Sequence, residues 1–283
     1  MAKIVSSTDG VSLHLHDLGG EGPALLLAHG TGFHGRLFKP FARRLESYAK
    51  WAPDLRGHGE TEPPQDLVFR WEGFANDLLA VVGEISPDEP ILGFAHSMGA
   101  AASLLAEAMQ PGTFAGIYCY EPIVIPAAVS EQTDPAQMSR FHEATRRRRR
   151  TFDSAQAAYE NYSSKPTLGE LDEASLKAYI EHGFEHADDG SLHIKMDPDH
   201  EALVYQMNSA HPTFDRLPEI TCPVVIARGQ RTPFGPPNWT EIIASRLPDA
   251  RIEEFDDLGH MGPFQDPDRI AESAHRFFSG LAR

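Results

Sequence analysis

The chain has 283 residues, 41% of them hydrophobic, which is enough for one domain with an insertion or for two smaller domains. Its 41 acidic and 25 basic residues give a formal net charge of -16, which disfavours nucleic acid and anionic membranes as partners. No apolar run approaches the length of a membrane span, and residues 1–10 lack the apolar core of a signal peptide. Two cysteines in apolar, strand-like runs are typical of reduced, buried thiols, so a cytoplasmic location is the default expectation.

Strand-like and helix-like segments alternate over the first 125 residues. Residues 4–6 and 11–17 alternate in polarity around the turn-like Asp9-Gly10, which predicts a hairpin. The continuous apolar run at 24–28 predicts a strand covered on both faces. Further strands are predicted at 49–53, 91–95 and 114–120, and helices at 37–45, 71–82 and 98–109. Repeated alternation of this kind implies a parallel sheet with right-handed crossovers.

The pattern changes between residues 126 and 212, where helical periodicity dominates. The predicted elements there are helices at 140–152, 171–184 and 199–207 and a short strand at 192–195. Alternation then resumes, with predicted strands at 224–227 and 251–255 and predicted helices at 238–247 and 266–278. We therefore predict an α/β core of residues 1–125 and 213–283, interrupted by a helical insert of residues 126–212.

Five consecutive arginines, residues 146–150, fall inside one of the predicted helices of the insert. On a helix they would point around most of the circumference, so some of them must face water. The simpler interpretation is a solvated helix face paired with nearby acids. The sharper one is that a single arginine reaches down to an anionic substrate.

The strongest chemical signal is Ala95-His96-Ser97-Met98-Gly99, which follows a predicted strand and opens a predicted helix. The nucleophile elbow has the pattern G-x-S-x-G in this context, because a tight, strained turn needs small residues beside the serine. Ala95 replaces the first glycine but is also small. We predict that Ser97 is a nucleophile, with the positive end of the following helix directed at a developing oxyanion.

A serine hydroxyl needs a base, and the predicted base is His260. His260 lies in the sequence Leu-Gly-His-Met-Gly-Pro, between the last predicted strand and the last predicted helix. A loop in that position opens onto the same edge of the sheet as Ser97, which distinguishes His260 among the chain's 14 histidines.

A glycine-containing loop, His29-Gly30-Thr31-Gly32-Phe33, follows an apolar strand. Glycines there let a backbone N–H group point into the cavity. We predict that the N–H groups of Thr31 and Met98 form an oxyanion hole, with Gly32 as the less favoured donor, and that Phe33 lines the acyl pocket.

These segments, together with the Asp-Leu-Arg-Gly-His-Gly sequence at 54–59, resemble the α/β-hydrolase family in order and spacing. The resemblance implies an α/β-hydrolase fold, a mostly parallel twisted sheet with helices on both faces, and a helical cap after Pro122. It does not define the substrate, since esterases, lactonases, thioesterases, amidases and carbon–carbon bond hydrolases share the motifs. Dehalogenases and epoxide hydrolases of this fold use an aspartate nucleophile, and Ser97 argues against both.

The resemblance also exposes one departure, at the acid that should orient His260. Family members usually carry this acid after the strand that corresponds to residues 224–227, but residues 228–233 contain no carboxylate and Thr232 stands where aspartate is expected. Some members carry it instead after the strand that follows the elbow helix, where this chain has Glu121. We predict that Glu121 holds the imidazole tautomer and stabilises the imidazolium, with Asp256 and Asp257 as the alternatives.

Further residues are predicted to fill or line the site. His29, His58 and His96 sit beside the motifs and are expected to be structural, and His96 is expected with Phe33 and Met261 around the substrate. Other aromatic residues offer an apolar pocket, and the candidates are Phe141, Phe152, Tyr159, Tyr162, Phe184, Tyr205, Phe234 and Trp239.

Together these features predict a serine hydrolase, closest to the carboxylic ester hydrolases, that cleaves an ester or related acyl bond of a small, partly apolar substrate through an acyl-enzyme. No metal site and no organic cofactor is predicted, and a homodimer is left open. Two alternatives remain. One is a lyase or cofactor-free oxygenase that uses the same histidine. The other is a ligand receptor without efficient turnover, which the missing acid after residues 224–227 favours.

Overall fold

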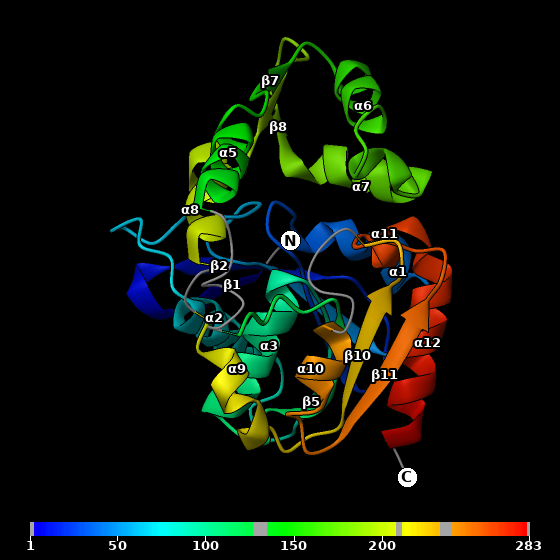
Figure 1. Ribbon diagram of the computed structural model, residues 1–283. Coiled ribbons are helices and arrows are strands. Elements are labelled where there is room, and N and C mark those ends of the chain that lie inside the picture. The colour runs from blue at the N-terminus through cyan, green and yellow to red at the C-terminus, as the bar shows by residue number, and fades with distance from the viewer. Residues whose placement is uncertain (1–2, 127–134, 208–210, 233–238, 282–283) are drawn as a thin grey trace.

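The computed structural model describes residues 3–126, 135–207, 211–232 and 239–281. Figure 1 shows a central sheet flanked by helices, with residues 135–207 lying above the sheet in this view. None of the helices within the described ranges is both long and apolar enough to cross a bilayer.

The central sheet has eight strands in the order β1-β2-β4-β3-β5-β6-β10-β11. The hairpin of β1 and β2 joins β4 in an antiparallel register, and every later neighbour pairs in parallel. This is the mostly parallel sheet with an amino-terminal hairpin that the sequence predicts. The strands are β1 (Lys3–Ser6), β2 (Ser12–Asp17), β3 (Ala24–Ala28), β4 (Ala49–Asp54), β5 (Ile91–His96), β6 (Phe114–Tyr120), β10 (Val224–Gly229) and β11 (Ala250–Phe255).

Helices cover both faces of the sheet, because successive side chains of a buried strand point to opposite sides. In β3, Leu25 and Leu27 pack into one apolar core, and Leu26 and Ala28 pack into the other. Helices α1 and α12 cover the first face, and α2, α3 and α10 cover the second. Their bounds are α1 (Lys39–Ala42), α2 (Trp71–Ile85), α3 (Met98–Met109), α10 (Trp239–Ala244) and α12 (Pro267–Leu281), with two short helices, α9 (Thr213–Arg216) and α11 (Gly262–Gln265).

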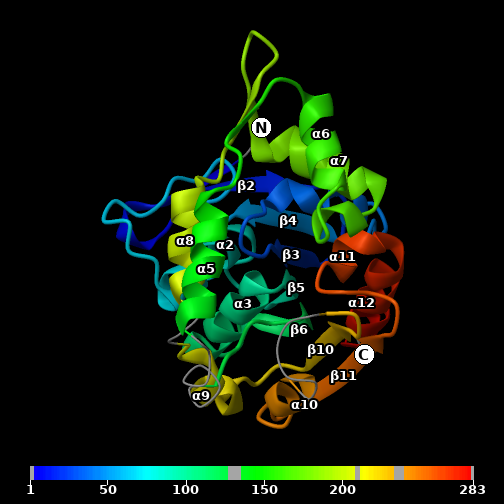
Figure 2. The same cartoon turned by 45° about the horizontal axis from the view of Figure 1, so that its top comes forward.

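The part of the insert that the structure describes combines four helices with a small antiparallel sheet, in the order β7-β9-β8. The helices form two pairs, α5 with α8 and α6 with α7 (Figure 2). Strand β9 confirms the short strand predicted near residue 192, whereas β7, β8 and α6 were not predicted. The elements are α5 (Pro135–Arg146), β7 (Thr151–Phe152), α6 (Ala155–Ser163), α7 (Glu173–Gly183), β8 (Phe184–His186), β9 (Leu192–Ile194) and α8 (Pro198–Gln206).

The prediction of one helix over residues 140–152 was wrong at its carboxyl end. Helix α5 ends at Arg146, and the chain re-enters an extended conformation in β7. The cause is tertiary packing: Phe152 pairs with Leu192 in the small sheet, is fully buried, and lies 5.8 Å from Phe184, ring centroid to ring centroid. The five arginines therefore do not share one helix: Arg146 and Arg150 both pair with Asp199, whereas Arg148 pairs with Glu201.

Candidate active site

The predicted nucleophile, base and acid meet at the carboxyl-terminal edge of the parallel strands. Ser97 directly follows β5, Glu121 directly follows β6, and His260 lies in the loop after β11. Backbone hydrogen bonds hold the ends of β5 and β6 against the next strand. The N–H of Ser97 donates to the carbonyl of Tyr120 over 3.0 Å, and the N–H of Glu121 donates to the carbonyl of Ala227 over 2.9 Å. Three segments that are distant in the sequence thus converge on one site.

Two of these residues have strained backbones. Ser97 has φ 55° and ψ -115°, and Glu121 has φ 46°, a region that residues other than glycine rarely adopt. Such strain persists only where the surroundings enforce it, and it concentrates at functional sites. At Ser97 the turn lifts the hydroxyl away from the strand and places it at the start of α3, as the elbow motif predicts.

Small residues make this turn feasible. A Cβ atom on Gly99 would lie 2.5 Å from the carbonyl oxygens of Ala28 and His29, and one on Gly30 would lie 3.1 Å from the Cβ of Ser97. Ala95, which replaces the first glycine of the motif, is fully buried. The elbow therefore needs a glycine two residues after the serine and accepts an alanine two residues before it.

This packing predicts opposite outcomes for two glycine-to-alanine substitutions. Gly99→Ala should lower the free energy of unfolding by about 3 kcal/mol and reduce turnover, because the backbone carbonyls that it meets cannot move aside. Gly83→Ala, in α2 with no atom within 4 Å of the added Cβ, should raise that free energy by about 0.5–1 kcal/mol. Urea unfolding of both variants measures the difference, and equal stability of the two would contradict the packing argument.

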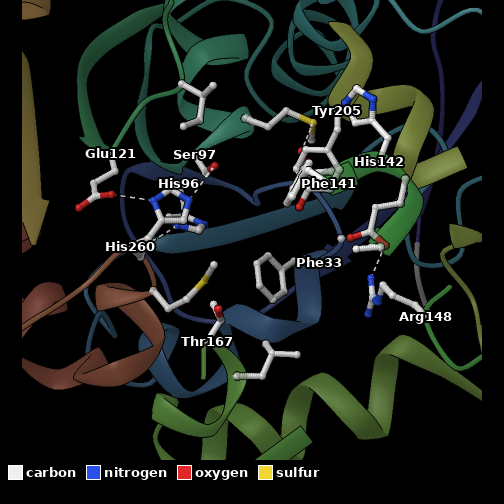
Figure 3. Close-up of a pocket in the computed structure, with 18 of the residues that line it drawn as sticks. Phe33, His96, Ser97, Glu121, Phe141, His142, Arg148, Thr167, Tyr205 and His260 are labelled. Atoms are coloured by element: carbon white, nitrogen blue, oxygen red, sulfur yellow. Dashed lines mark hydrogen bonds and ion pairs between the residues drawn. The ribbon is translucent and has the colours of Figure 1, made fainter. Parts of the chain in front are cut away.

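A continuous hydrogen-bond chain joins the three side chains (Figure 3). Nδ1 of His260 lies 2.7 Å from Oε2 of Glu121, and Nε2 lies 3.1 Å from Oγ of Ser97. A carboxylate can only accept, so Nδ1 carries the ring proton and Nε2 is left to accept the hydroxyl proton of Ser97. This is the tautomer that a histidine needs in order to deprotonate a serine.

Glu121 is also the carboxylate that contacts the histidine, rather than the alternatives considered from sequence. Its second oxygen, Oε1, accepts a hydrogen bond of 2.9 Å from the N–H of Gly229, so both oxygens are held. Asp256 is exposed, and Asp257 is exposed and paired with Arg269 over 2.6 Å. Glu121, at the end of the neighbouring strand β6, thus takes the position relative to His260 that a carboxylate near Thr232 would have taken.

The two predicted oxyanion donors lie beside Ser97 in the wall of one cavity, which Thr31 and Met98 both line. The Oγ1 of Thr31 donates to the sulfur of Met98 over 3.3 Å, which joins the loop to the start of α3. Met98 is the first residue of α3, so its N–H has no acceptor within the helix. Gly32 has φ +82°, and a Cβ there would lie 2.6 Å from Oε1 of Glu201.

The three histidines next to the motifs are buried. His96 is fully buried, and its Nε2 donates to the carbonyl of His260 over 2.8 Å, which supports the loop of the predicted base. Burial and the neighbouring His260 hold the pKa of His96 well below its usual value. Burial likewise lowers the pKa of His29 to about 3 and that of His58 to about 4. All three rings are therefore neutral at neutral pH.

The cavity has a volume of about 1630 Å³, and residues of both the sheet layer and the insert line it. Phe33, His96 and Met261, the predicted substrate-side residues, are all in its wall. So are four of the aromatic candidates, namely Phe141, Tyr162, Tyr205 and Trp239. Phe152 and Phe184 are instead buried in the core of the insert, and Phe234 lies outside the described residues.

Sequence reasoning missed one functional candidate, Glu201. Its carboxylate lies in the cavity wall and pairs with the guanidinium of Arg148. Glu201, Val204 and Tyr205 follow the i, i+3, i+4 spacing of one helical face, so an acid within an apolar stripe was the available signal. Within the described ranges, no group of three or more His, Cys, Asp or Glu side chains could hold a metal ion.

Comparison with known proteins agrees with this architecture. The family model described as "Alpha/beta hydrolase family" matches residues 25–273, so the chain belongs to the α/β-hydrolase family. Monoglyceride lipase of Rattus norvegicus is 31% identical over 114 residues, which are 38% of this chain and 38% of that protein. Lipase LipV of Mycobacterium tuberculosis is 32% identical over 116 residues, which are 40% of this chain and 43% of that protein. The chain thus matches under half the length of these curated relatives.

A solved structure extends the likeness over the whole chain. The peroxisomal α/β-hydrolase Lpx1 of Saccharomyces cerevisiae superposes with a TM-score of 0.81 at 15% identity, covering 99% of this chain and 85% of that one. At this identity the likeness shows the fold alone, and it confirms the α/β-hydrolase fold predicted from the sequence.

Proposed function

We propose that this protein is a serine hydrolase that cleaves a carboxylic ester, or a related acyl bond, of a small substrate. The observation that carries the proposal is the hydrogen-bond chain from Glu121 through His260 to Ser97, at the wall of a large cavity. The lipases to which the chain is similar favour an ester over an amide.

In the first half of the reaction, the Oγ of Ser97 attacks the acyl carbonyl while Nε2 of His260 takes the hydroxyl proton. The carbonyl oxygen becomes an oxyanion, which accepts hydrogen bonds from the N–H groups of Thr31 and Met98. His260 then gives its proton to the leaving alkoxide, and the alcohol departs. The acyl group remains bonded to Ser97.

In the second half, His260 takes a proton from water, and the resulting hydroxide attacks the acyl-enzyme. The tetrahedral intermediate collapses, His260 returns the proton to Ser97, and the acid is released. The net reaction converts ester and water into acid and alcohol. Throughout, Glu121 holds the ring in the required tautomer and stabilises its protonated form.

Residues 126–212 act as a cap in this proposal, and residues 1–125 and 213–283 form the catalytic core. Side chains from both parts line the cavity, so the cap selects the acyl group that reaches Ser97. The alternative of a receptor without turnover was favoured by the missing acid after residues 224–227. In this proposal Glu121, which lies within hydrogen-bond distance of His260, supplies that carboxylate, so the argument for a receptor no longer holds.

A fluorophosphonate probe tests the proposal, since it phosphonylates an activated serine much faster than an ordinary hydroxyl group. The intact mass should increase by one phosphonyl group in the unmodified chain and in Ser103→Ala, a buried serine of the same helix. The increase should be absent in Ser97→Ala. Failure to label the folded chain, or labelling that persists in Ser97→Ala, would contradict the assignment.

A further inference from the structure

One cation of the insert lies inside the cavity wall rather than on the surface. The side chain of Arg148 is 20% exposed and is held from two helices, by the carboxylate of Glu201 in α8 and by the hydroxyl of Tyr179 in α7. The bond from Nη2 of Arg148 to Tyr179 is 2.7 Å long, and a weaker contact of 3.5 Å joins Nη2 to the hydroxyl of Tyr162. This guanidinium is therefore fixed in position.

The contacts that hold the guanidinium of Arg148 do not use all of its hydrogen-bond donors. A guanidinium carries five N–H groups, and the contacts with Glu201, Tyr179 and Tyr162 use three of them. Within the part of the chain that the structure describes, Nε and the second N–H of Nη1 have no hydrogen-bond acceptor in the protein. Arg148 lines the cavity, so a ligand bound there can supply acceptors for these two N–H groups.

Arg148 also lies close to the predicted oxyanion hole. A Cβ atom placed on Gly32 would be 3.6 Å from Nη1 of Arg148. Gly32 directly follows Thr31, so the guanidinium lies within roughly 10 Å of the Thr31 N–H at the usual spacing of backbone atoms. In the view of Figure 3, Phe33 lies between His260 and Arg148. A short, partly apolar acyl chain can span this distance.

The charge of the cavity wall is opposite to that of the whole chain, which carries a net charge of -16. Among the described lining residues, the acids are Glu121 and Glu201, and each is already paired, with His260 and with Arg148. A concave site lined by charge of one sign concentrates ligands of the opposite charge. The arginines and lysines of the described lining are Arg146, Arg147, Arg148, Arg149, Lys165 and Arg228. Three of them, Arg146, Arg147 and Arg149, pair with acids outside the lining.

We propose that the substrates are half-esters of short dicarboxylic acids, whose free carboxylate pairs with Arg148 while the ester carbonyl faces Thr31 and Met98. This inference rests on the proposed function and specifies its substrate class. A planar carboxylate suits a guanidinium. The free carboxylate lies about two to four carbons from the reacting carbonyl, given C–C bonds of about 1.5 Å. Water cleaves the ester bond, releasing the alcohol and the dicarboxylate.

Two esters that differ only in the terminal carboxylate test the inference: monoethyl glutarate and ethyl butyrate, followed by ethanol release. The unmodified enzyme should have a KM at least about tenfold lower for the half-ester, the size expected of a hydrogen bond to a charged group. Arg148→Met should abolish that preference, so that its KM for monoethyl glutarate is no lower than its KM for ethyl butyrate. Arg150→Met, at a position outside the cavity lining whose guanidinium pairs with Asp197 and Asp199, should preserve the preference.

Removing Arg148 alone leaves the buried carboxylate of Glu201 without its partner, so the double variant Arg148→Met/Glu201→Gln, which removes both charges of the pair, is also needed. It should fold and have the same KM for the two esters. Hydrolysis of both esters with equal KM in the unmodified enzyme, or a preference that survives in the double variant, overturns the inference and leaves the proposed function intact.

A binding measurement separates the inference from the proposed function. Isothermal titration with glutarate should show binding to the unmodified chain and at least about tenfold weaker binding to the double variant. If neither ester is hydrolysed and the fluorophosphonate does not label Ser97, the proposed function fails. The titration with glutarate then tests the carboxylate-binding site at Arg148 on its own. No glutarate binding to the unmodified chain would overturn that site.

Discussion

Replacing Ser97 by alanine should lower kcat for ester hydrolysis by about 10⁶-fold, because the acyl-enzyme route disappears and the triad acts as one unit. The fold should persist, since alanine only removes the hydroxyl. Measurement of kcat with ethyl butyrate checks this, beside Ser103→Ala, which removes a buried hydroxyl that bonds to the Gly99 carbonyl over 2.8 Å and should retain kcat within a few-fold.

The same pair of measurements separates a hydrolase from the alternatives on this fold. A lyase or cofactor-free oxygenase would need the base but not the nucleophile. Turnover that survives Ser97→Ala and is lost in His260→Ala would therefore contradict the serine mechanism and favour those reactions.

Replacing Glu121 by glutamine should lower kcat by about 10³–10⁴-fold, because the isosteric amide favours the wrong tautomer of His260. The N–H of Gly229 donates to one oxygen of Glu121 over 2.9 Å, so the amide oxygen takes that position and its NH₂ group turns toward Nδ1 of His260. Nδ1 must then accept, Nε2 carries the proton, and the ring can no longer deprotonate Ser97.

The control for this substitution is Asp257→Asn, which changes the alternative acid in the same isosteric way. Asp257 is exposed and pairs with Arg269, so kcat should stay within about twofold. Nearly normal turnover in Glu121→Gln, together with a large loss in Asp257→Asn, would transfer the acid's role to Asp257.

The core, Ser97 and His260 could be predicted because their signals are local. A continuous apolar strand, a small-residue turn and a helix surround Ser97, and parallel strands must bring their carboxyl ends to one edge. Glu121 was predicted from the resemblance instead, since some α/β-hydrolases carry the acid after the strand that follows the elbow helix and the expected position near Thr232 held no carboxylate.

The insert could not be predicted to the same depth, because long-range contacts decide it. Strand β7 has two residues, too few for a periodic pattern, and it forms because Phe152 packs against Phe184 and pairs with Leu192. Helical propensity extends through the arginines, yet this packing stops the helix at Arg146. The pairing of Arg148 with Glu201 joins residues 53 positions apart, which no local pattern encodes.

A crystal structure of the fluorophosphonate adduct would test the mechanism most directly, since the tetrahedral phosphorus mimics the intermediate. We predict a bond from Oγ of Ser97 to phosphorus, with the phosphonyl oxygen within hydrogen-bond distance of the Thr31 and Met98 N–H groups and Nε2 of His260 beside Oγ. Phosphorus on another residue, or a phosphonyl oxygen turned away from both amides, would contradict it.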